Sequence, residues 1–181
     1  MTRIATPALD TATGATAEIY AQIKKAAGSV PNTFASIGAH GPEALQAVLA
    51  ADGVLAGGSL SKQDQETIKL IVSEVAGCDY CVAAHSLLGK LTGLKPDTLV
   101  DLRAGRGTGD AKRDALASFV RTLASTSGTV PVAQFEAIKA AGYSDRQLVD
   151  ISLAIALTVF TNVFNRINDT AIDFPAVPSI G

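Results

Sequence analysis

Two cysteines, a histidine and a glutamate lie close together in one stretch of the chain, in a pattern suited to thiol chemistry. The stretch from Glu66 to His85 reads ETIKLIVSEVAGCDYCVAAH. Cys78 and Cys81 are three residues apart at the predicted start of a helix, so their sulfurs can meet where the helix N-terminus favours a thiolate. His85 follows Cys81 by four residues, which on a helix places the imidazole on the same face, one turn away. The pattern predicts a thiol pair with a proton acceptor nearest to Cys81.

A carboxylate is expected to complete this group. Glu66 precedes Gly77 by eleven residues, and Gly77 is the expected tip of an antiparallel pair of helices. The residue eleven beyond Gly77 is Leu88, about one turn from His85, so Glu66 is expected to face His85 across the pair. A carboxylate there would orient the imidazole and raise its basicity. Glu74 lies nearer to the cysteines in sequence and is the competing carboxylate.

The same residues have other interpretations. The two thiols could simply be packed in a core. Alternatively, Cys78, Cys81 and His85, with a carboxylate or His40, could supply four zinc ligands, although this spacing differs from the usual zinc-finger pattern. A thioredoxin-type site is disfavoured, because its C-x-x-C belongs to a βαβ pattern and the chain shows no such pattern. Asp79 is expected to cap the helix, and its charge opposes a thiolate on Cys78.

Helix signals recur along the chain and predict one all-α domain over residues 1–181, with a loose N-terminal arm over residues 1–13. The expected helices span residues 15–27, 31–38, 42–55, 62–76, 78–91, 96–104, 111–125, 131–141 and 145–168. Ser61 and Asp110 are predicted N-caps, and Ser144 forms a capping box with Gln147. The apolar middle of the last helix, ISLAIALTVF, is expected at the centre of the fold or at a subunit contact.

Composition agrees with a compact helical protein and argues against several partners. Hydrophobic residues make up 48% of the 181 residues and charged residues 18%, which excludes wholesale disorder. The net charge is −2, and no run of five Lys or Arg occurs, so nucleic-acid binding and a polybasic membrane patch are not expected. The N-terminus lacks an apolar leader, and the apolar run between Asp150 and Arg166 is shorter than the roughly 20 residues of a membrane span. We expect a soluble, cytoplasmic protein.

The stretch QETIKLIVSEVAGCDYCVAAH resembles the core of the carboxymuconolactone decarboxylase superfamily. The resemblance is to its alkylhydroperoxidase D-like branch, whose motif is Glu, eleven residues, Cys-x-x-Cys, three residues, His. The segments SVPNTF and FTNVFNRINDT are similar to the peroxidase-related enzymes of this branch, so the resemblance covers about residues 30–175. It implies the AhpD-like helical fold, a homo-oligomer (trimer or hexamer), and a thiol peroxidase without haem, metal or other cofactor.

On this resemblance, Cys81 is the peroxidatic cysteine, Cys78 is the resolving cysteine, and His85 with Glu66 forms a proton relay. Peroxide would oxidise Cys81 to a sulfenic acid, which Cys78 would convert to a disulfide. An external dithiol of lipoyl or thioredoxin type would then reduce the disulfide. The family pattern has a second histidine directly before its second cysteine, where this chain has Tyr80. Tyrosine, with a pKa near about 10, can donate a hydrogen bond but cannot replace a base at neutral pH.

Two functions of other classes stay open. His85 and Glu66 could act as acid and base on a small lactone or keto acid, an activity that would survive alkylation of the thiols. Alternatively, the cysteines could form a disulfide that changes assembly without turnover. The apolar helix faces predict a hydrophobic approach to the cysteines, which suits organic hydroperoxides. The candidates for its wall, or for a subunit interface, are Leu70, Ser73, Phe160 and Phe164.

Overall fold

The computed structural model describes residues 2–180, and these residues form helices joined by turns, with no strand among them. Apart from the short 3-10 helix η1 (Leu9–Thr11), every helix was expected from sequence, with ends within two residues of the prediction. The helices are α1 (Gly14–Ala27), α2 (Asn32–His40), α3 (Pro42–Ala56), α4 (Lys62–Val75), α5 (Asp79–Leu91), α6 (Pro96–Ala104), α7 (Ala111–Ser125), α8 (Val132–Ala140) and α9 (Asp145–Asn168). The all-α prediction is confirmed.

The hairpin of α4 and α5 carries the cysteine segment. The Ser61 hydroxyl caps α4 by accepting a hydrogen bond from the Asp64 N–H at 3.0 Å, as the sequence predicted. Gly77 forms the tip with φ +64°, a left-handed conformation that residues with a Cβ adopt reluctantly. The next helix begins one residue later than expected, because Cys78 is its N-cap. Asp79 therefore lies in the first turn and does not cap the helix.

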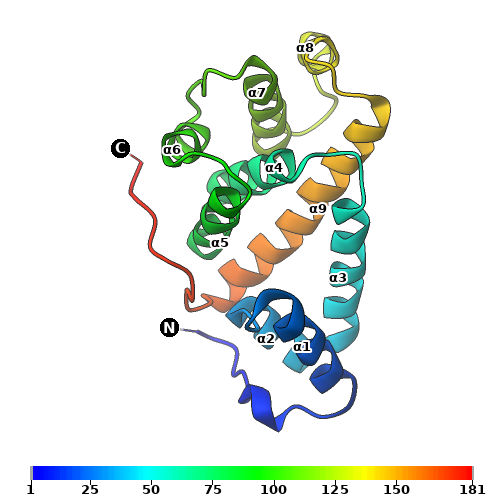
Figure 1. The fold of residues 1–181 in the computed structure, drawn as a ribbon, viewed down its shortest axis with the longest axis vertical. Coiled ribbons are helices and arrows are strands. Elements are labelled where there is room, and N and C mark those ends of the chain that lie inside the picture. Colours follow the sequence, from blue (N-terminus) through cyan, green and yellow to red (C-terminus); the bar gives the residue numbers. More distant parts are fainter. Residues whose placement is uncertain (1, 181) are drawn as a thin grey trace.

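Helix α9 runs diagonally through the molecule and packs against α3, α4 and α5 (Figure 1). Its capping box of Ser144 and Gln147 is present as predicted. At 24 residues it is longer than the apolar run noted in the sequence, and by length and composition alone it could cross a membrane. One face nevertheless carries buried polar groups, among them Asp150 and Asn165, which bond to other parts of the fold. These bonds are typical of a core helix in a globular protein.

Two hydrophobic clusters lie on either side of this helix. The larger one joins α4 to α7 and α9 through fully buried side chains such as Ile68, Leu116 and Ile151. The smaller one joins α1, α2 and α3, with Leu45 fully buried, and Phe164 of α9 packs against it. Because α9 contributes to both clusters, it holds the α4–α5 hairpin in a fixed position relative to α2 and α3.

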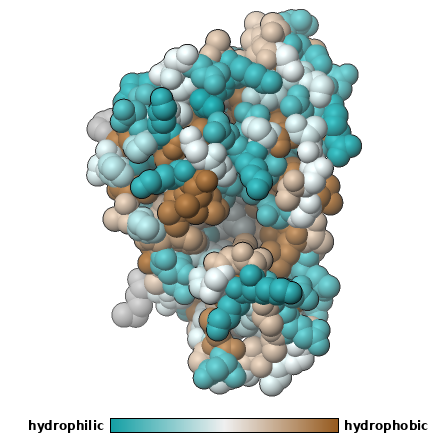
Figure 2. All heavy atoms as spheres, in the orientation of Figure 1, coloured by the Kyte–Doolittle hydropathy of each residue, from teal (hydrophilic) through white to brown (hydrophobic). Residues whose placement is uncertain are grey.

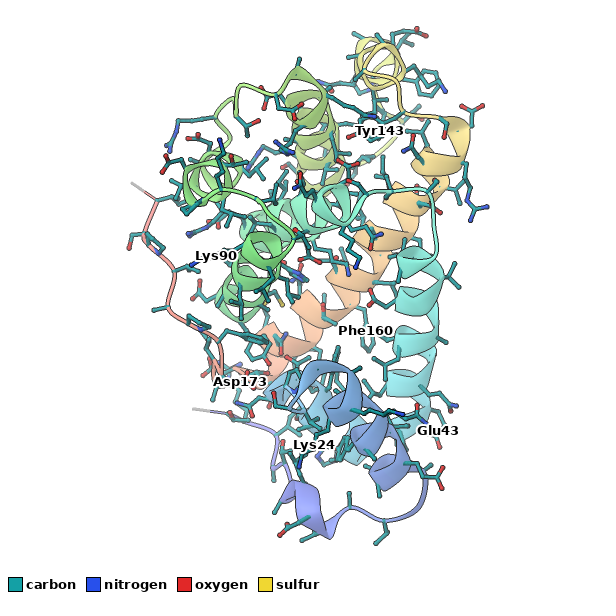
Figure 3. All side chains as sticks on the ribbon, in the orientation of Figure 1. Lys24, Glu43, Lys90, Tyr143, Phe160 and Asp173 are labelled. Atoms are coloured by element: carbon teal, nitrogen blue, oxygen red, sulfur yellow. The ribbon has the colours of Figure 1, made fainter. Side chains whose placement is uncertain are left out.

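In Figure 1 the N-terminal arm and the C-terminal tail both reach the left side of the molecule. The arm expected to be loose is extended and largely exposed, but the backbone N–H of Arg3 donates to the Asn168 carbonyl at 2.7 Å. The C-terminal tail runs back past α5 to α6, where the Arg103 guanidinium donates to the Pro178 carbonyl at 2.7 Å. The tail thereby brings Asp173 to the cysteine segment (Figure 3).

Candidate active site

The two cysteines form a close, buried thiol pair. Their sulfurs are 2.8 Å apart, a distance at which one thiol hydrogen-bonds to the other, and both are free cysteines. The side chains are only 2% and 3% exposed, respectively. At this distance a disulfide can form with little movement of the backbone.

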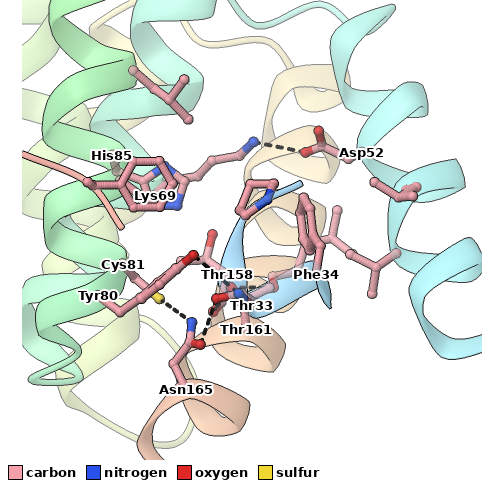
Figure 4. Close-up of a pocket in the computed structure, with 17 residues that line it drawn as sticks. Thr33, Phe34, Asp52, Lys69, Tyr80, Cys81, His85, Thr158, Thr161 and Asn165 are labelled. Atoms are coloured by element: carbon pink, nitrogen blue, oxygen red, sulfur yellow. Dashed lines mark hydrogen bonds and ion pairs between the residues drawn. The ribbon is translucent and has the colours of Figure 1, made fainter. Parts of the chain in front are cut away.

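Only one of the two cysteines lines the apolar cavity of the site, which has a volume of about 210 Å³. Figure 4 shows Cys81 among the residues that line it. Cys81 and His85 both line this cavity, and Cys78 does not. In Figure 2 hydrophobic side chains lie on both sides of a hollow in the middle of the molecule, between α5 and α3. The other walls come from α2, α3, α9 and the tail, through Phe34, Val48, Leu49, Leu157, Thr158, Thr161 and Phe174.

None of the four residues proposed from sequence as wall candidates lines this cavity. Leu70 is fully buried in the larger core cluster, and Ser73 lies in the core beside α9. Phe164 packs on the α1–α3 cluster, while Phe160 is exposed on α9 (Figure 3). Helix period alone could not tell which apolar face meets the cavity, because that depends on where α2 and α3 pack.

The thiol pair is tuned to lose one proton near neutral pH. The hydrogen bond with Cys81 lowers the pKa of Cys78 to about 7, against the opposing effects of burial and, as expected, of the Asp79 charge. The same hydrogen bond, with burial, raises the pKa of Cys81 well above its usual value. The lower pKa places the negative charge first on Cys78, and Cys81, which lines the cavity, becomes the thiolate when the proton shared across 2.8 Å passes from it to Cys78.

A side-chain amide from α9 supports this charge. Asn165 Nδ2 donates to Cys81 Sγ at 3.1 Å, and its Oδ1 accepts from the Thr33 hydroxyl at 2.7 Å, which fixes the orientation of the amide. Asn162, one turn earlier, donates to Ser73 Oγ. Sequence analysis assigned no role to these asparagines. The available signal was their spacing of three residues, with Asn168, along the second half of α9.

Replacing Asn165 with leucine should slow the reaction of the reduced protein with a hydroperoxide by about ten- to a hundredfold, the cost of losing a hydrogen bond to a charged group. The measurement is a single-turnover reaction with cumene hydroperoxide, quenched with acid and followed by thiol counting. Asn168→Leu is the matched control, because Asn168 bonds to Ser36 and Thr170 and not to a cysteine. Equal slowing in both variants would show that a disturbance of α9, and not the loss of the Asn165 amide, lowers the rate.

His85 and Glu66 are in contact, as the hairpin geometry predicted. His85 Nδ1 lies 2.9 Å from Glu66 Oε2, and both side chains are largely buried. Since a carboxylate accepts a hydrogen bond, Nδ1 carries the proton and Nε2 is the basic nitrogen. The basic nitrogen belongs to a ring that lines the same cavity as the Cys81 sulfur.

The other charged groups nearby have separate roles. Glu74, the competing carboxylate, pairs with the Arg103 guanidinium at 2.7 Å and takes no part in the contact with His85. Lys69, which sequence analysis did not single out, lies 4.0 Å from Glu66 and 2.8 Å from Asp52 on α3. The Lys69–Asp52 pair also lines the cavity and joins α4 to α3.

Tyr80 acts as a hydrogen-bonding and packing residue, as expected. Its hydroxyl donates to Asp173 Oδ1 at 2.7 Å and accepts from the Thr33 N–H at 3.2 Å. Its ring meets Phe174 edge to face, with the centroids 5.4 Å apart. Burial raises the pKa of Tyr80 above its usual value, so the phenol is neutral and does not serve as a base. Through its contacts with Asp173 and Phe174, Tyr80 holds the C-terminal tail next to the two cysteines.

Residues 2–180 contain no set of side chains arranged as the zinc alternative requires. His40, the proposed fourth ligand, is at the end of α2, where its Nε2 lies 2.7 Å from the Ala5 carbonyl oxygen. Within the described part of the chain, no three His, Cys, Asp or Glu side chains are arranged to hold a metal ion.

The pKa of the thiol pair predicts a pH dependence. Because only the thiolate is nucleophilic and the pKa of Cys78 is lowered to about 7, alkylation by iodoacetamide should rise with pH to a midpoint near 7. Below the midpoint the rate should fall about tenfold per pH unit. Mass spectrometry of quenched samples measures this rate. In Cys78→Ser the remaining thiol has lost its thiol partner and its midpoint should move upward, so an unchanged midpoint would contradict the shared proton.

Comparisons with known proteins agree on family and fold. The sequence profile of the carboxymuconolactone decarboxylase family matches residues 42–121, from the start of α3 into α7, which include Glu66, both cysteines and His85. No curated protein matches the chain by sequence.

Solved structures match over almost the whole chain. A protein from Ralstonia eutropha JMP134, described as an alkylhydroperoxidase AhpD core and an uncharacterized peroxidase-related protein, is 24% identical with a TM-score of 0.85, covering 95% of this chain and 92% of its own. A peroxidase-related protein from Silicibacter sp. TM1040 is 23% identical with a TM-score of 0.80, covering 94% and 91%. The debrominase Bmp8, as a cysteine-to-alanine variant in complex with 2,3,4-tribromopyrrole, is 17% identical with a TM-score of 0.79, covering 96% and 93%. The chain has the AhpD-like fold.

Proposed function

We propose that this chain, which belongs to the carboxymuconolactone decarboxylase family over residues 42–121, is a thiol-dependent reductase of organic hydroperoxides. The observation that carries the proposal is the placement of the two sulfurs. Cys81 and the imidazole of His85 both line the apolar cavity. Cys78 does not line it, but its Sγ lies 2.8 Å from the Sγ of Cys81. A nucleophile, a base and a resolving thiol thus meet where a small apolar substrate fits.

In the proposed reaction His85 Nε2 takes one proton from the thiol pair, and the Cys81 thiolate attacks the terminal oxygen of the hydroperoxide. The O–O bond breaks, Cys81 becomes a sulfenic acid, and the alkoxide takes a proton from the relay of His85 and Glu66 to leave as an alcohol. Cys78 then attacks the Cys81 sulfur and releases water as the disulfide forms. Overall, one hydroperoxide and two thiols give one alcohol, one water and one disulfide, which an external dithiol reduces.

The lining of the cavity supports an organic substrate. Its walls are mainly aliphatic and aromatic, with Lys69 and Asp52 as the charged pair, and its volume is about 210 Å³. An alkyl or aryl group gains free energy by leaving water for such a surface, whereas hydrogen peroxide does not. We therefore expect a lower KM for cumene hydroperoxide than for hydrogen peroxide.

A steady-state assay tests this proposal. With dihydrolipoamide as the electron donor, the protein should convert cumene hydroperoxide to its alcohol, with one disulfide of the donor formed per alcohol. No consumption above the protein-free rate would contradict the proposal. Lactone turnover that survives alkylation of both thiols would favour acid–base chemistry. Since the cavity also suits a small aromatic ring, 2,3,4-tribromopyrrole is the rival substrate, and bromide release faster than peroxide reduction would indicate dehalogenation.

We also propose that the chain forms a homo-oligomer through the uncovered side of α9. Val149, Val159, Val163 and Ile167 recur on this helix at helical spacing and are 44–64% exposed. Replacing Val163 with aspartate should shift the protein to monomers in sedimentation velocity, because a buried unpaired charge opposes the contact. Val54→Asp, on an exposed face of α3, is the control. An unchanged sedimentation coefficient in Val163→Asp would place the contact elsewhere.

A further inference from the structure

We infer that the external dithiol attacks Cys78, and that it reaches this sulfur through a second depression, separate from the peroxide cavity. The inference rests on the proposed function and adds to it the place where the reductant binds. The depression has a volume of about 450 Å³ and lies between the start of α5 and the end of α9. It is lined by residues 77–80, 165–166 and 169–172.

The two cysteines line different spaces. Cys81 lines the cavity with His85 but not the depression, whereas Cys78 lines the depression but not the cavity. Tyr80 and Asn165 line both, so they form the partition between the two spaces. This partition is held firmly, because the Tyr80 hydroxyl bonds to Asp173 and Thr33, and Thr33 also bonds to the Asn165 amide.

Displacement at sulfur has a fixed geometry, so formation of the disulfide and its reduction use different spaces. A nucleophile, the sulfur it attacks and the leaving group lie nearly in line, so attack comes from the side opposite the leaving group. When Cys78 attacks the sulfenic acid of Cys81, the leaving hydroxyl must point away from Cys78, and the space lined by Cys81 without Cys78 is the peroxide cavity. When the disulfide is reduced at Cys78, the attacking thiolate must come from the side away from Cys81. The depression is the space lined by Cys78 without Cys81.

The reductive step balances without a further reactant. One thiolate of the dithiol forms a bond to Cys78 Sγ, and the Cys78–Cys81 bond breaks with its electron pair on Cys81. The leaving thiolate is received by the Asn165 N–H, which lies 3.1 Å from Cys81 Sγ. The second thiol of the donor then attacks the donor sulfur of the mixed disulfide and releases Cys78. The donor leaves as a cyclic disulfide, and the two protons that it lost restore the thiol pair.

The burial of Cys78 restricts what can carry out this attack. Its side chain is only 2% exposed, so the reductant must enter the depression. A slender dithiol at the end of a flexible arm, free or attached to a protein, meets this requirement. A dithiol fixed on the flat surface of a protein domain does not, unless the tail moves. The depression therefore favours a slender dithiol over a dithiol fixed on a flat protein surface.

The first experiment identifies the attacked sulfur. The protein is oxidised with diamide, which makes the disulfide without peroxide, and is then exposed briefly to excess 2-mercaptoethanol and quenched with acid. Alkylation of the released thiol and peptide mapping locate the mercaptoethanol adduct. We expect the adduct on Cys78 and the alkyl group on Cys81, and an adduct mainly on Cys81 would overturn the inference. Because no peroxide is used, failure of the peroxidase reaction would leave this test intact.

The second experiment separates the two spaces with matched tryptophan variants. Ala171 lines only the depression and Leu88 lines only the cavity, and both are exposed. Ala171→Trp should slow reduction of the disulfide by dihydrolipoamide by at least about tenfold and spare the peroxide half-reaction. Leu88→Trp should do the reverse. Equal rates of reduction in wild type and Ala171→Trp would overturn the inference, as would faster reduction by thioredoxin that Ala171→Trp does not affect.

Discussion

Replacing Cys81 with serine should lower hydroperoxide turnover to the protein-free rate, a loss of at least about a thousandfold. A serine hydroxyl is not ionised near pH 7, so it cannot supply the nucleophile that Cys81 presents to the cavity. Neighbouring Cys78 does not line the cavity and cannot take over without movement of the Tyr80 partition. The measurement is the rate of cumyl alcohol formation with dihydrolipoamide as donor.

Cys78→Ser is the matched control, because it removes the other sulfur of the same pair. It should consume one hydroperoxide per protein and then stop, because the sulfenic acid on Cys81 has no partner. Dimedone should trap that sulfenic acid, and peptide mapping should place the adduct on Cys81. A Cys81→Ser variant that keeps full turnover, or that forms a dimedone adduct on Cys78, would reverse the assigned roles.

Removing the imidazole should have the second-largest effect. His85→Gln should lower the rate of the peroxide half-reaction by about 10²- to 10⁴-fold, the usual contribution of a positioned acid–base group. Glu66→Gln should cost about 10- to 100-fold, because the amide can no longer stabilise the imidazolium through the contact now made at 2.9 Å. Rapid-quench thiol counting with cumene hydroperoxide measures both rates.

Glu74→Gln controls for the loss of a carboxylate near the hairpin. Glu74 pairs with Arg103 and does not contact His85, so its rate should stay near wild type. Since Glu66 acts through His85, the double variant should be little slower than His85→Gln alone. Equal slowing in Glu66→Gln and Glu74→Gln would contradict the proposal that Glu66 acts through His85. A double variant whose rate loss equals the product of the losses in Glu66→Gln and His85→Gln would contradict it as well.

Local signals made the helices and the relay contact predictable. Ser61, Asp110 and Ser144 cap their helices through side-chain bonds that depend only on residues two or three positions away. Gly77 marks the tip of the α4–α5 hairpin because it adopts a left-handed conformation. Once the tip is known, helix geometry alone brings Glu66 opposite His85, and the structure shows this contact.

The remainder of the site depends on contacts between distant parts of the chain. Asn165 and Thr33 are 132 residues apart, yet together they hold the amide on Cys81. Phe174 reaches the cavity from an irregular tail that has no periodicity to interpret. Leu70 was a plausible wall residue on α4, but its face of the helix meets the large core cluster. Such placements follow from how helices pack, which the spacing of residues along one helix does not specify.

A single-turnover titration tests the central claim most directly. The fully reduced protein is mixed with increasing cumene hydroperoxide, without any external thiol, and its mass, free thiols and alcohol product are measured. The account predicts that one equivalent of hydroperoxide removes both thiols, gives one equivalent of alcohol and leaves the protein lighter by two hydrogens. Two free thiols and an unchanged mass after prolonged exposure would contradict it and would turn attention to acid–base chemistry at His85 and Glu66.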